Sequence, residues 1–457
     1  MKNTKPKVRL WSVLTGLTAI LTVAAIVGNI IANQYATTLN VALNASTYKI
    51  IHGENTGDTE YFKKGFASDE EREAYEAELC ATVEAEGAAL LKNENNALPL
   101  ASGAKVSLFG HGSVDLMYGG TGSGSVDTSK APNLKQALEA QGITINQTLW
   151  DLYSSDSMMS KYSRMTPASI SDTLEANTQY AVNEAPWSAL SSAESSFAEY
   201  GDAAIVVVSR VGGEAGAYYP GEEGLADGVH TVNGNILSLS DEEMAMIEEA
   251  KANFDKVIVL VNAANPMEIS NLEEDPDIDA ILWVGYPGAY GFYGVADVLN
   301  GTVAPSAHLG DTFVKNGALA PAMQNFGNIP WANASDFAEG TSVNSYLIET
   351  EGIYTGYRYY ETRYADIVLG NGGANASAGT YANADGTVAA SDGTWSYDNE
   401  VVYPFGYGMS YTTFEQTLDS VVITGDKRTA TVTVTTTNTG DVAGKAVVQL
   451  YASAPYT

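Results

Sequence analysis

The longest apolar run in the chain lies close to its N-terminus. Residues 10–33 (LWSVLTGLTAILTVAAIVGNIIAN) contain no charged side chain over 24 positions. At 1.5 Å per residue a helix of that length crosses about 30 Å of hydrocarbon, so we expect a transmembrane helix. Residues 1–9 carry four basic side chains and no acid, which predicts that the N-terminus stays in the cytoplasm and the rest of the chain is exported.

A cleaved signal peptide is the alternative interpretation of the same run. Its apolar stretch exceeds the usual 7–15 residues of a signal core, and no small-x-small cleavage site follows it closely. The sequence therefore favours a single-pass signal anchor in the cell membrane with an extracellular main domain, and a protein secreted after signal cleavage remains the alternative.

Short apolar runs alternate with helical patterns through the middle of the chain. Continuous runs of Val, Ile and Leu are typical of strands that are buried on both faces of a parallel sheet. We therefore expect an α/β fold, a mostly parallel α/β sandwich domain with loops at the carboxyl ends of its strands. The predicted strands are residues 105–110, 203–210, 256–262 and 278–285, and the predicted helices are residues 68–92, 133–141, 240–253 and 290–299.

The pattern changes beyond residue 301. Residues 345–364 are dense in tyrosine, and the Gly/Ala-rich residues near 365–400 read as a surface loop. Residues 416–457 alternate like paired strands, at 430–437 and 446–454, and predict a partial all-β immunoglobulin-like sandwich, because a complete one needs about 100 residues. The predicted division is a cytoplasmic tail and anchor at 1–34, a stalk at 35–68, the α/β domain at 69–415 and the incomplete β-domain at 416–457.

Charge and composition exclude several classes of function. The chain has 23 Lys and Arg against 55 Asp and Glu, a net charge of −32, which argues against a nucleic-acid partner. The one cysteine, Cys80, cannot form a disulfide within the chain or a cysteine-built metal centre. The four histidines are far apart in sequence, so we expect no metal and no cofactor.

A glycine-rich loop follows the first predicted strand of the α/β domain. Residues 119–125 (GGTGSGS) occupy the place of a dinucleotide fingerprint, but they come nine residues after the strand end, which makes a tight pyrophosphate-binding turn a poor match. A loop that binds a polyhydroxylated ligand fits as well or better, and a purely structural loop is a further alternative. The predicted substrate-binding residues here are Gly122, Ser123, Ser125 and Asp127.

A second candidate segment leaves the strand at residues 203–210. The sequence SRVGGEAG (209–216) places Arg210 and Glu214 just outside the carboxyl end of this strand, where ligands gather in open α/β sheets. Glycines on both sides allow the backbone to approach a substrate closely. A glutamate in a loop is more often solvated surface, and the same applies to Glu222, Glu223 and Asp227.

Five ordered motifs together resemble glycoside hydrolase family 3. They are residues 84–100 (EAEGAALLKNENNALPL), the SRVGGE loop, LSLSDEE (237–243), IYTGYRYYET (353–362) and YPFGYGMSYTTF (403–414). Residues 432–456 resemble that family's fibronectin type III-like domain. The resemblance implies a β-glucosidase-type, retaining enzyme that acts on terminal β-linked sugars, so its partner is an oligosaccharide or β-glycoside substrate.

The resemblance also implies site roles and a domain arrangement. Glu214 matches the acid/base position of the family, and Arg210 with the 119–127 loop would bind substrate. The nucleophile of the family lies on a barrel, which the permuted arrangement would place downstream of Thr457, so this chain alone is expected to be inactive. Ala215, Ala217 and residues 305–313 (PSAHLGDTF) depart from the family pattern, which leaves sugar preference open. A non-catalytic carbohydrate-binding or cell-surface module is the alternative function.

Overall fold

The computed structural model describes most of the chain. The described residues are 5–36, 39–40, 43, 65–120, 122–162, 184–212, 237–325, 329–333, 336, 345–349, 351–367, 381–382, 388–389 and 397–452. The chain divides into two compact units, Met1–Ala67 and Ser68–Thr457.

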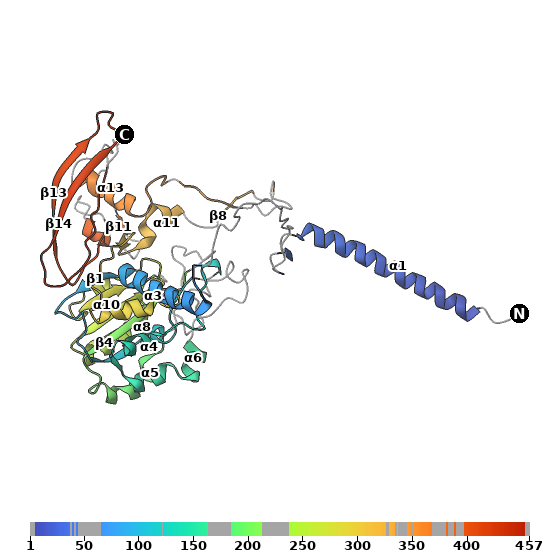
Figure 1. The fold of residues 1–457 in the computed structure, drawn as a ribbon, viewed down its shortest axis with the longest axis horizontal. Helices are drawn as coiled ribbons and strands as arrows, with labels where there is room; N and C mark the ends of the chain where they lie inside the picture. The colour runs from blue at the N-terminus through green and yellow to red at the C-terminus, as the bar shows by residue number, and fades with distance from the viewer. Residues whose placement is uncertain are drawn as a thin grey trace. The chain divides into compact units, whose positions relative to one another are not determined.

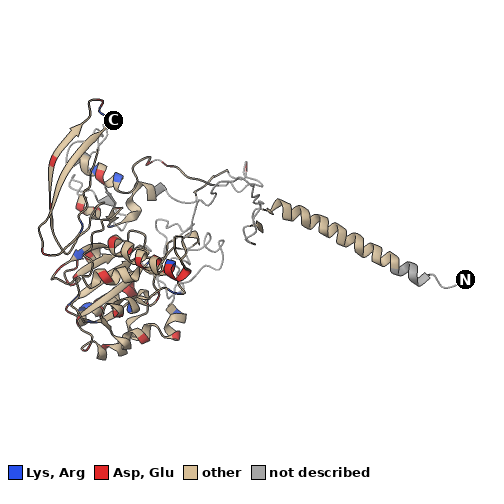
Figure 2. Ribbon diagram, viewed as in Figure 1, with Lys and Arg blue, Asp and Glu red and all other residues tan. Residues whose placement is uncertain are grey.

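The first unit contains the long helix α1 (Lys5–Gln34) (Figure 1). Its segment Trp11–Gln34 is long and apolar enough to cross a membrane, a property that a signal sequence shares. Figure 2 shows no charged residue along the described part of this helix. The predicted helix is therefore confirmed, and its placement in a membrane stays a prediction.

The second unit is built on a six-stranded sheet with the order β1-β6-β5-β4-β2-β3. Strands β2 to β6 pair in parallel, and β1 pairs antiparallel with β6 at one edge. All four strands predicted from apolar runs are present, as β2, β4, β5 and β6. The strand bounds are β1 Ala89–Asn93, β2 Lys105–Phe109, β3 Thr144–Ile145, β4 Ala203–Ser209, β5 Val257–Asn262 and β6 Ala280–Trp283.

Helices cover both faces of this sheet, as the sequence predicted for an α/β sandwich (Figure 1). Along β4, Ile205 and Val207 belong to one buried cluster and Val206 and Val208 to the other, because successive side chains of a strand point to opposite faces. The first cluster includes residues of α3 (Asp69–Gly87), α4 (Leu134–Ala140) and α10 (Phe292–Leu299), and the second includes residues of α5 (Gln147–Tyr153), α6 (Asp156–Tyr162) and α8 (Asp241–Asn253).

The helix predicted to run from residue 68 to about 92 is shorter in the structure. Its N-terminus is capped by Ser68, but it ends at Gly87, and β1 begins two residues later. Leu90 and Leu91 belong to the clusters on opposite faces of the sheet, and the buried Lys92 ammonium donates to the Glu273 and Asp275 carbonyls at 2.8 Å each. Strand pairing with β6 therefore overrides the local helical pattern.

The remaining elements are short. The described 3₁₀ helices are His111–Ser113, Gly122–Gly124, Trp187–Ala189, Ser191–Ser196, Gly317–Leu319 and Tyr397–Asn399. The α-helices are α9 (Ser270–Glu273), α11 (Pro321–Asn325) and α13 (Tyr357–Ile367), which lies in the tyrosine-rich region. The strands are β7 (Phe313–Val314), β8 (Ile329–Pro330), β9 (Ser345–Tyr346), β10 (Tyr381–Ala382), β11 (Val388–Ala389) and β12 (Val401–Tyr403).

The last described segment contains an antiparallel hairpin. Strand β13 (Phe414–Ile423) pairs with β14 (Ala430–Asn438), which confirms the strand predicted at 430–437. The strand predicted at 446–454 is wrong for its described part, because residues 446–452 form no strand. The Val447 carbonyl accepts a hydrogen bond from the Gln416 side chain of β13 at 3.0 Å. An alternating pattern of apolar and polar residues forms a β-strand only where another strand pairs with it.

Candidate functional site

The order of the strands places a topological switch point between β2 and β4. From β2 the chain continues outward to β3, whereas β4, β5 and β6 follow one another in the opposite direction. In open α/β sheets, ligands bind outside the carboxyl ends of the strands at such a point. Both candidate segments of the sequence, the loop after residue 110 and the segment after residue 209, begin there.

The loop after β2 starts in close contact with β4. Gly110 has a φ of 91°, and a Cβ atom there would lie 2.5 Å from the carbonyl oxygen of Val207. A Cβ on Gly112 would lie 2.8 Å from the same oxygen. Only glycine allows this approach, so the two glycines hold the beginning of the loop against the neighbouring strand.

A buried glutamate fixes the next residue of this loop. Glu184 accepts a hydrogen bond from the His111 amide at 2.6 Å, and its other oxygen accepts from the Ala185 amide at 3.0 Å and the Tyr153 hydroxyl at 3.3 Å. The Tyr153 hydroxyl in turn accepts from the Gly110 amide at 3.0 Å. Burial, and secondarily the charge of Glu243, raises the pKa of Glu184 to about 8.

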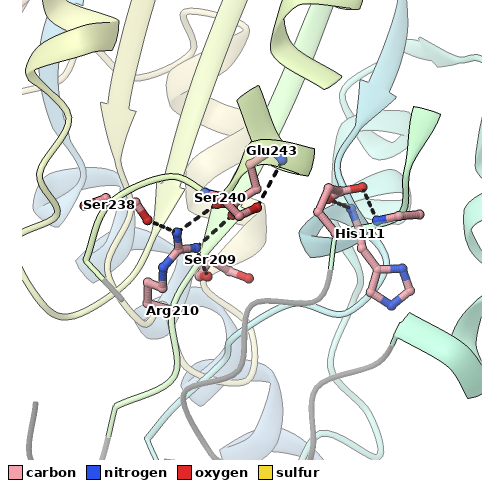
Figure 3. Close-up of polar contacts among 8 residues, drawn as sticks. His111, Ser209, Arg210, Ser238, Ser240 and Glu243 are labelled. Atoms are coloured by element: carbon pink, nitrogen blue, oxygen red, sulfur yellow. Dashed lines mark hydrogen bonds and ion pairs between the residues drawn. The ribbon is translucent and has the colours of Figure 1, made fainter. Parts of the chain in front are cut away.

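The segment after β4 starts with a buried ion pair. Both terminal nitrogens of the Arg210 guanidinium lie 2.8 Å from Glu243 carboxylate oxygens, and they also donate to the carbonyls of Ser209 and Ser238 (Figure 3). The Arg210 and Glu243 side chains are 1% and 4% exposed. The same carboxylate accepts a hydrogen bond from the Ser240 amide at 2.8 Å, while the Ser240 hydroxyl accepts from the Glu243 amide, a capping box for α8.

Arg210 therefore has a role that the sequence did not indicate. Its guanidinium binds protein groups on α8 and on the residues just before it. These contacts do not test whether Arg210 also touches a sugar, so direct substrate binding by Arg210 stays a prediction.

The end of β5 completes this edge of the sheet. The buried Asn262 accepts a hydrogen bond from the Met117 amide at 2.7 Å and donates to the carbonyls of Met117 at 2.9 Å and Gly285 at 2.7 Å. The Tyr286 hydroxyl donates to the Arg210 carbonyl at 2.9 Å. The segments that follow β2, β4, β5 and β6 are thus linked by buried and part-buried hydrogen bonds.

The residues predicted to bind substrate in the glycine-rich loop lie on the surface. Gly122 and Ser123 belong to a 3₁₀ turn, and these two residues, Ser125 and Asp127 are all exposed. The Asp127 carboxylate accepts a hydrogen bond from the Ser129 amide at 2.9 Å, and this bond lowers the pKa of Asp127. Their exposure leaves them accessible to a ligand, and a sugar contact stays a prediction.

The predicted acid/base, Glu214, lies outside the described residues, as do Glu222, Glu223 and Asp227. Among the residues that are described, no group of three or more His, Cys, Asp or Glu side chains could hold a metal ion.

The sequence profile described as "Glycosyl hydrolase family 3 C-terminal domain" matches residues 88–411. The chain belongs to glycosyl hydrolase family 3. The resemblance to the family is thus confirmed, and the matched residues include the whole sheet, its covering helices other than α3 and the segment up to β12.

Known relatives of this family 3 chain include enzymes and solved structures. Beta-glucosidase A of Butyrivibrio fibrisolvens is 30% identical over 83% of this chain and 41% of its own length, and the beta-glucosidase of Ruminococcus albus is 29% identical over 83% and 32%. Beta-glucosidase 3B of Thermotoga neapolitana, solved with α-D-glucose, has a TM-score of 0.57 at 26% identity over 82% of this chain and 43% of that one. The chain spans less than half the length of these relatives.

Three residues of this family 3 site were not singled out from the sequence. Glu243 ends the LSLSDEE motif (237–243) and lies in the helix predicted over 240–253, but neither pattern indicated its ion pair with Arg210. Asn262 is the only polar residue of β5 and stands at its end. A polar residue at the end of an apolar strand is a sequence signal for a hydrogen-bonding role. Glu184 has no such signal, because nothing near it in sequence indicates burial.

Proposed function

We propose that this chain supplies the acid/base of a retaining, β-glucosidase-type glycoside hydrolase that acts on terminal β-linked sugars. The observation that carries the proposal is the hydrogen-bonded edge of the sheet at the switch point. The segment that contains Glu214 follows β4 at this edge, and Glu214 is four residues after Arg210 in the sequence. Family membership and the beta-glucosidase names of the relatives support the reaction class.

In this proposal Glu214 is the general acid and base. Retaining glycosidases use two carboxyl groups about 5–5.5 Å apart, one as nucleophile and the other as the proton donor that later activates water. The proton donor must hold its proton near neutral pH, which burial and a neighbouring carboxylate achieve by raising the pKa. The nucleophile would lie on a barrel domain, which we place downstream of Thr457 in the complete protein.

The other parts of the chain have supporting roles in the proposal. The exposed loop with Gly122, Ser123, Ser125 and Asp127 would donate and accept hydrogen bonds at sugar hydroxyls. Helix α1 would anchor the protein in the cell membrane with the α/β domain outside. We assign the β13–β14 hairpin to a fibronectin type III-like domain.

The proposal is tested by assaying the complete reading frame and this chain alone on aryl β-glucosides. Glu214→Ala should reduce kcat/KM for phenyl β-glucoside by about 10²–10⁴-fold, the usual contribution of a general acid. Azide should restore turnover of an activated substrate, because a small anion needs no base to attack the glycosyl-enzyme.

Glu222→Ala is the matched control, since Glu222 is a glutamate of the same segment, and its rate should stay within a factor of about three. An undiminished rate in Glu214→Ala would reject the acid/base assignment. Sugar binding by a complete protein that hydrolyses no glycoside would instead favour the carbohydrate-binding module.

A further inference from the structure

Two asparagines that lie close together at the end of β5 have different surroundings. The buried Asn262 makes three hydrogen bonds, to both backbone groups of Met117 and to the Gly285 carbonyl. Asn265 is half-buried, its amide atoms are accessible, and its side chain has no hydrogen-bond partner among the described residues. Asn262 thus holds the fold together, whereas Asn265 keeps its donor and acceptor groups available to a ligand.

Asn265 lies where three neighbouring strands end. Gly212, Asn265 and Tyr286 are each the third residue after a parallel strand, namely β4, β5 and β6. The Asn265 side-chain oxygen lies 2.8 Å, and the Tyr286 hydroxyl oxygen 2.9 Å, from the position that a Cβ on Gly212 would occupy. The three residues therefore meet at one point outside the carboxyl ends of the strands, which is where open α/β sheets bind their ligands.

The groups around the Asn265 amide are held in place. The Tyr286 hydroxyl donates to the Arg210 carbonyl at 2.9 Å, and the Arg210 side chain is fixed by Glu243, with both nitrogen–oxygen distances 2.8 Å. Pro266 follows Asn265 and disfavours a helical backbone at this residue. A ligand that binds here would therefore have to order few protein groups, which lowers the entropic cost of binding.

The chemistry of an amide suits a neutral ligand that is rich in hydroxyl groups. An asparagine side chain has one acceptor and two donors, so it can accept a hydrogen bond from one sugar hydroxyl and donate to the next hydroxyl on the ring. The net charge of the chain, −32, disfavours an anionic ligand. Gly212 contributes because it has no side chain, since a Cβ there would force the Asn265 oxygen to move.

We propose that Asn265 binds two hydroxyl groups of the glycoside, and that Gly212 leaves the space that the Asn265 amide occupies. The inference rests on the proposed function, which supplies the substrate class. Asn265 determines specificity in this proposal and takes no part in proton transfer. Its loss should therefore weaken substrate binding and leave the chemical step largely unchanged.

The test compares Asn265→Ala and Asn265→Asp with the wild type in the complete protein. The Kd of methyl β-thiocellobioside, a disaccharide whose glycosidic sulfur resists hydrolysis, is measured by calorimetry. Asn265→Ala should raise it about 5-fold to 100-fold, the usual effect of two lost hydrogen bonds, and Asn265→Asp, which loses the donors, about threefold or more. The KM for cellobiose should rise in parallel while kcat stays within a factor of about two. An unchanged Kd in Asn265→Ala, or a wild type that does not bind the thio-disaccharide, would overturn the proposal.

Gly212→Ala tests the geometry without changing the amide itself. The added methyl carbon would lie 2.8 Å from the Asn265 oxygen, so the side chain must turn away and the Kd should rise as it does in Asn265→Ala. The double variant should bind no more weakly than Asn265→Ala, because both changes remove the same contact. Losses that add in the double variant would contradict the role of Gly212.

Asn271→Ala is the matched control, since the exposed Asn271 side chain donates to the Met244 sulfur at 3.1 Å, and its Kd should stay within a factor of about two of the wild type. Urea unfolding of Asn265→Ala should match that of the wild type, and a loss of stability with an unchanged Kd would assign Asn265 to the fold. An active enzyme whose Kd does not change in Asn265→Ala rejects this inference alone. A protein that binds the thio-disaccharide through Asn265 but hydrolyses no glycoside rejects only the proposed function.

Discussion

Met117 and Asn262 form a reciprocal pair of hydrogen bonds across the edge of the sheet. The Met117 amide donates to the Asn262 side-chain oxygen at 2.7 Å, and the Asn262 amide donates to the Met117 carbonyl at 2.9 Å. The Asn262 side chain thus gives the backbone of the loop after β2 the two hydrogen bonds that a neighbouring strand would otherwise provide. This arrangement ties the loop that leads to Gly122 to the end of β5.

Asn262→Ala should therefore be strongly destabilising. The change leaves the amide and carbonyl of Met117 and the carbonyl of Gly285 without their partner inside the protein, and each unsatisfied buried group costs about 1–3 kcal/mol. We expect the free energy of unfolding in urea to fall by about 3 kcal/mol. Asn271→Ala is the control, because its exposed side chain donates only to the Met244 sulfur among the described contacts, and it should change the value by less than about 0.5 kcal/mol. Equal effects of the two changes would contradict the role of Asn262.

Gly110→Ala and Gly112→Ala test the close approach of the loop to β4. Each added methyl group would meet the Val207 carbonyl oxygen, and Gly110 would also be forced into a backbone conformation that disfavours alanine. We expect each change to lower the stability of the α/β domain by about 1–3 kcal/mol, measured by thermal or urea unfolding.

Gly124→Ala provides the matched control for these two variants. Gly124 lies farther along the same loop, and nothing lies within 4 Å of a Cβ placed there. Its stability should stay within about 0.5 kcal/mol of the wild type. A Gly124→Ala variant as unstable as Gly110→Ala would contradict the role of the contact with Val207 in the effect.

Glu84 on α3 predicts a pH dependence of stability. One of its carboxylate oxygens is buried and has no hydrogen-bond partner among the described residues, and burial raises the pKa of Glu84 from 4.5 to about 9. Between these values the folded state keeps a proton that the unfolded state releases. The stabilisation is complete below about pH 4.5 and is lost as the pH rises to about 9.

Glu84→Gln removes this dependence because glutamine does not titrate. The difference in stability between variant and wild type should be small at pH 5 and should shift in favour of the variant by up to about 1.4 kcal/mol per pH unit between pH 5 and pH 9. Urea unfolding at five pH values measures it. Parallel stability curves for the two proteins would show that Glu84 is ionised in the folded state.

Helix α1 predicts that the protein stays in the membrane fraction. In cells that express the full sequence, the protein should resist extraction by alkaline carbonate, and a form that begins at Ser68 should be released. N-terminal sequencing of the mature protein decides between anchor and signal peptide. A mature chain that starts after residue 34 would contradict the anchor.

The parallel core of the sheet was predictable from the sequence because its strands need little context. Residues such as Ile205, Val206 and Val207 are buried on both faces of the sheet, so each strand is a continuous apolar run. The caps Ser68 and Ser240 likewise satisfy helix ends through residues only three positions away. These features are therefore determined by residues that lie close together in the sequence.

Features that depend on distant partners were not predictable. Gly87 is the only local stop signal before Ala89–Asn93, and the strand conformation of these five residues comes from pairing with β6. Residues 446–452 show the reverse case, since their alternation predicted a strand for which the described chain supplies no ladder partner. Glu184 meets His111 across 73 residues of sequence, and no pattern near either residue announces the contact.

The position of β1 also has a consequence for synthesis. Its Lys92 binds the carbonyl of Glu273, 181 residues later, and its backbone pairs with β6, which follows Glu273 in the chain. At about 5–20 residues per second, a ribosome needs roughly 10–40 seconds to add that length. During that time Leu90 and Leu91 have been synthesised, but β6, with which their strand pairs, has not. The β1 edge of the sheet therefore cannot form until β6 has been synthesised, when most of the domain has been made.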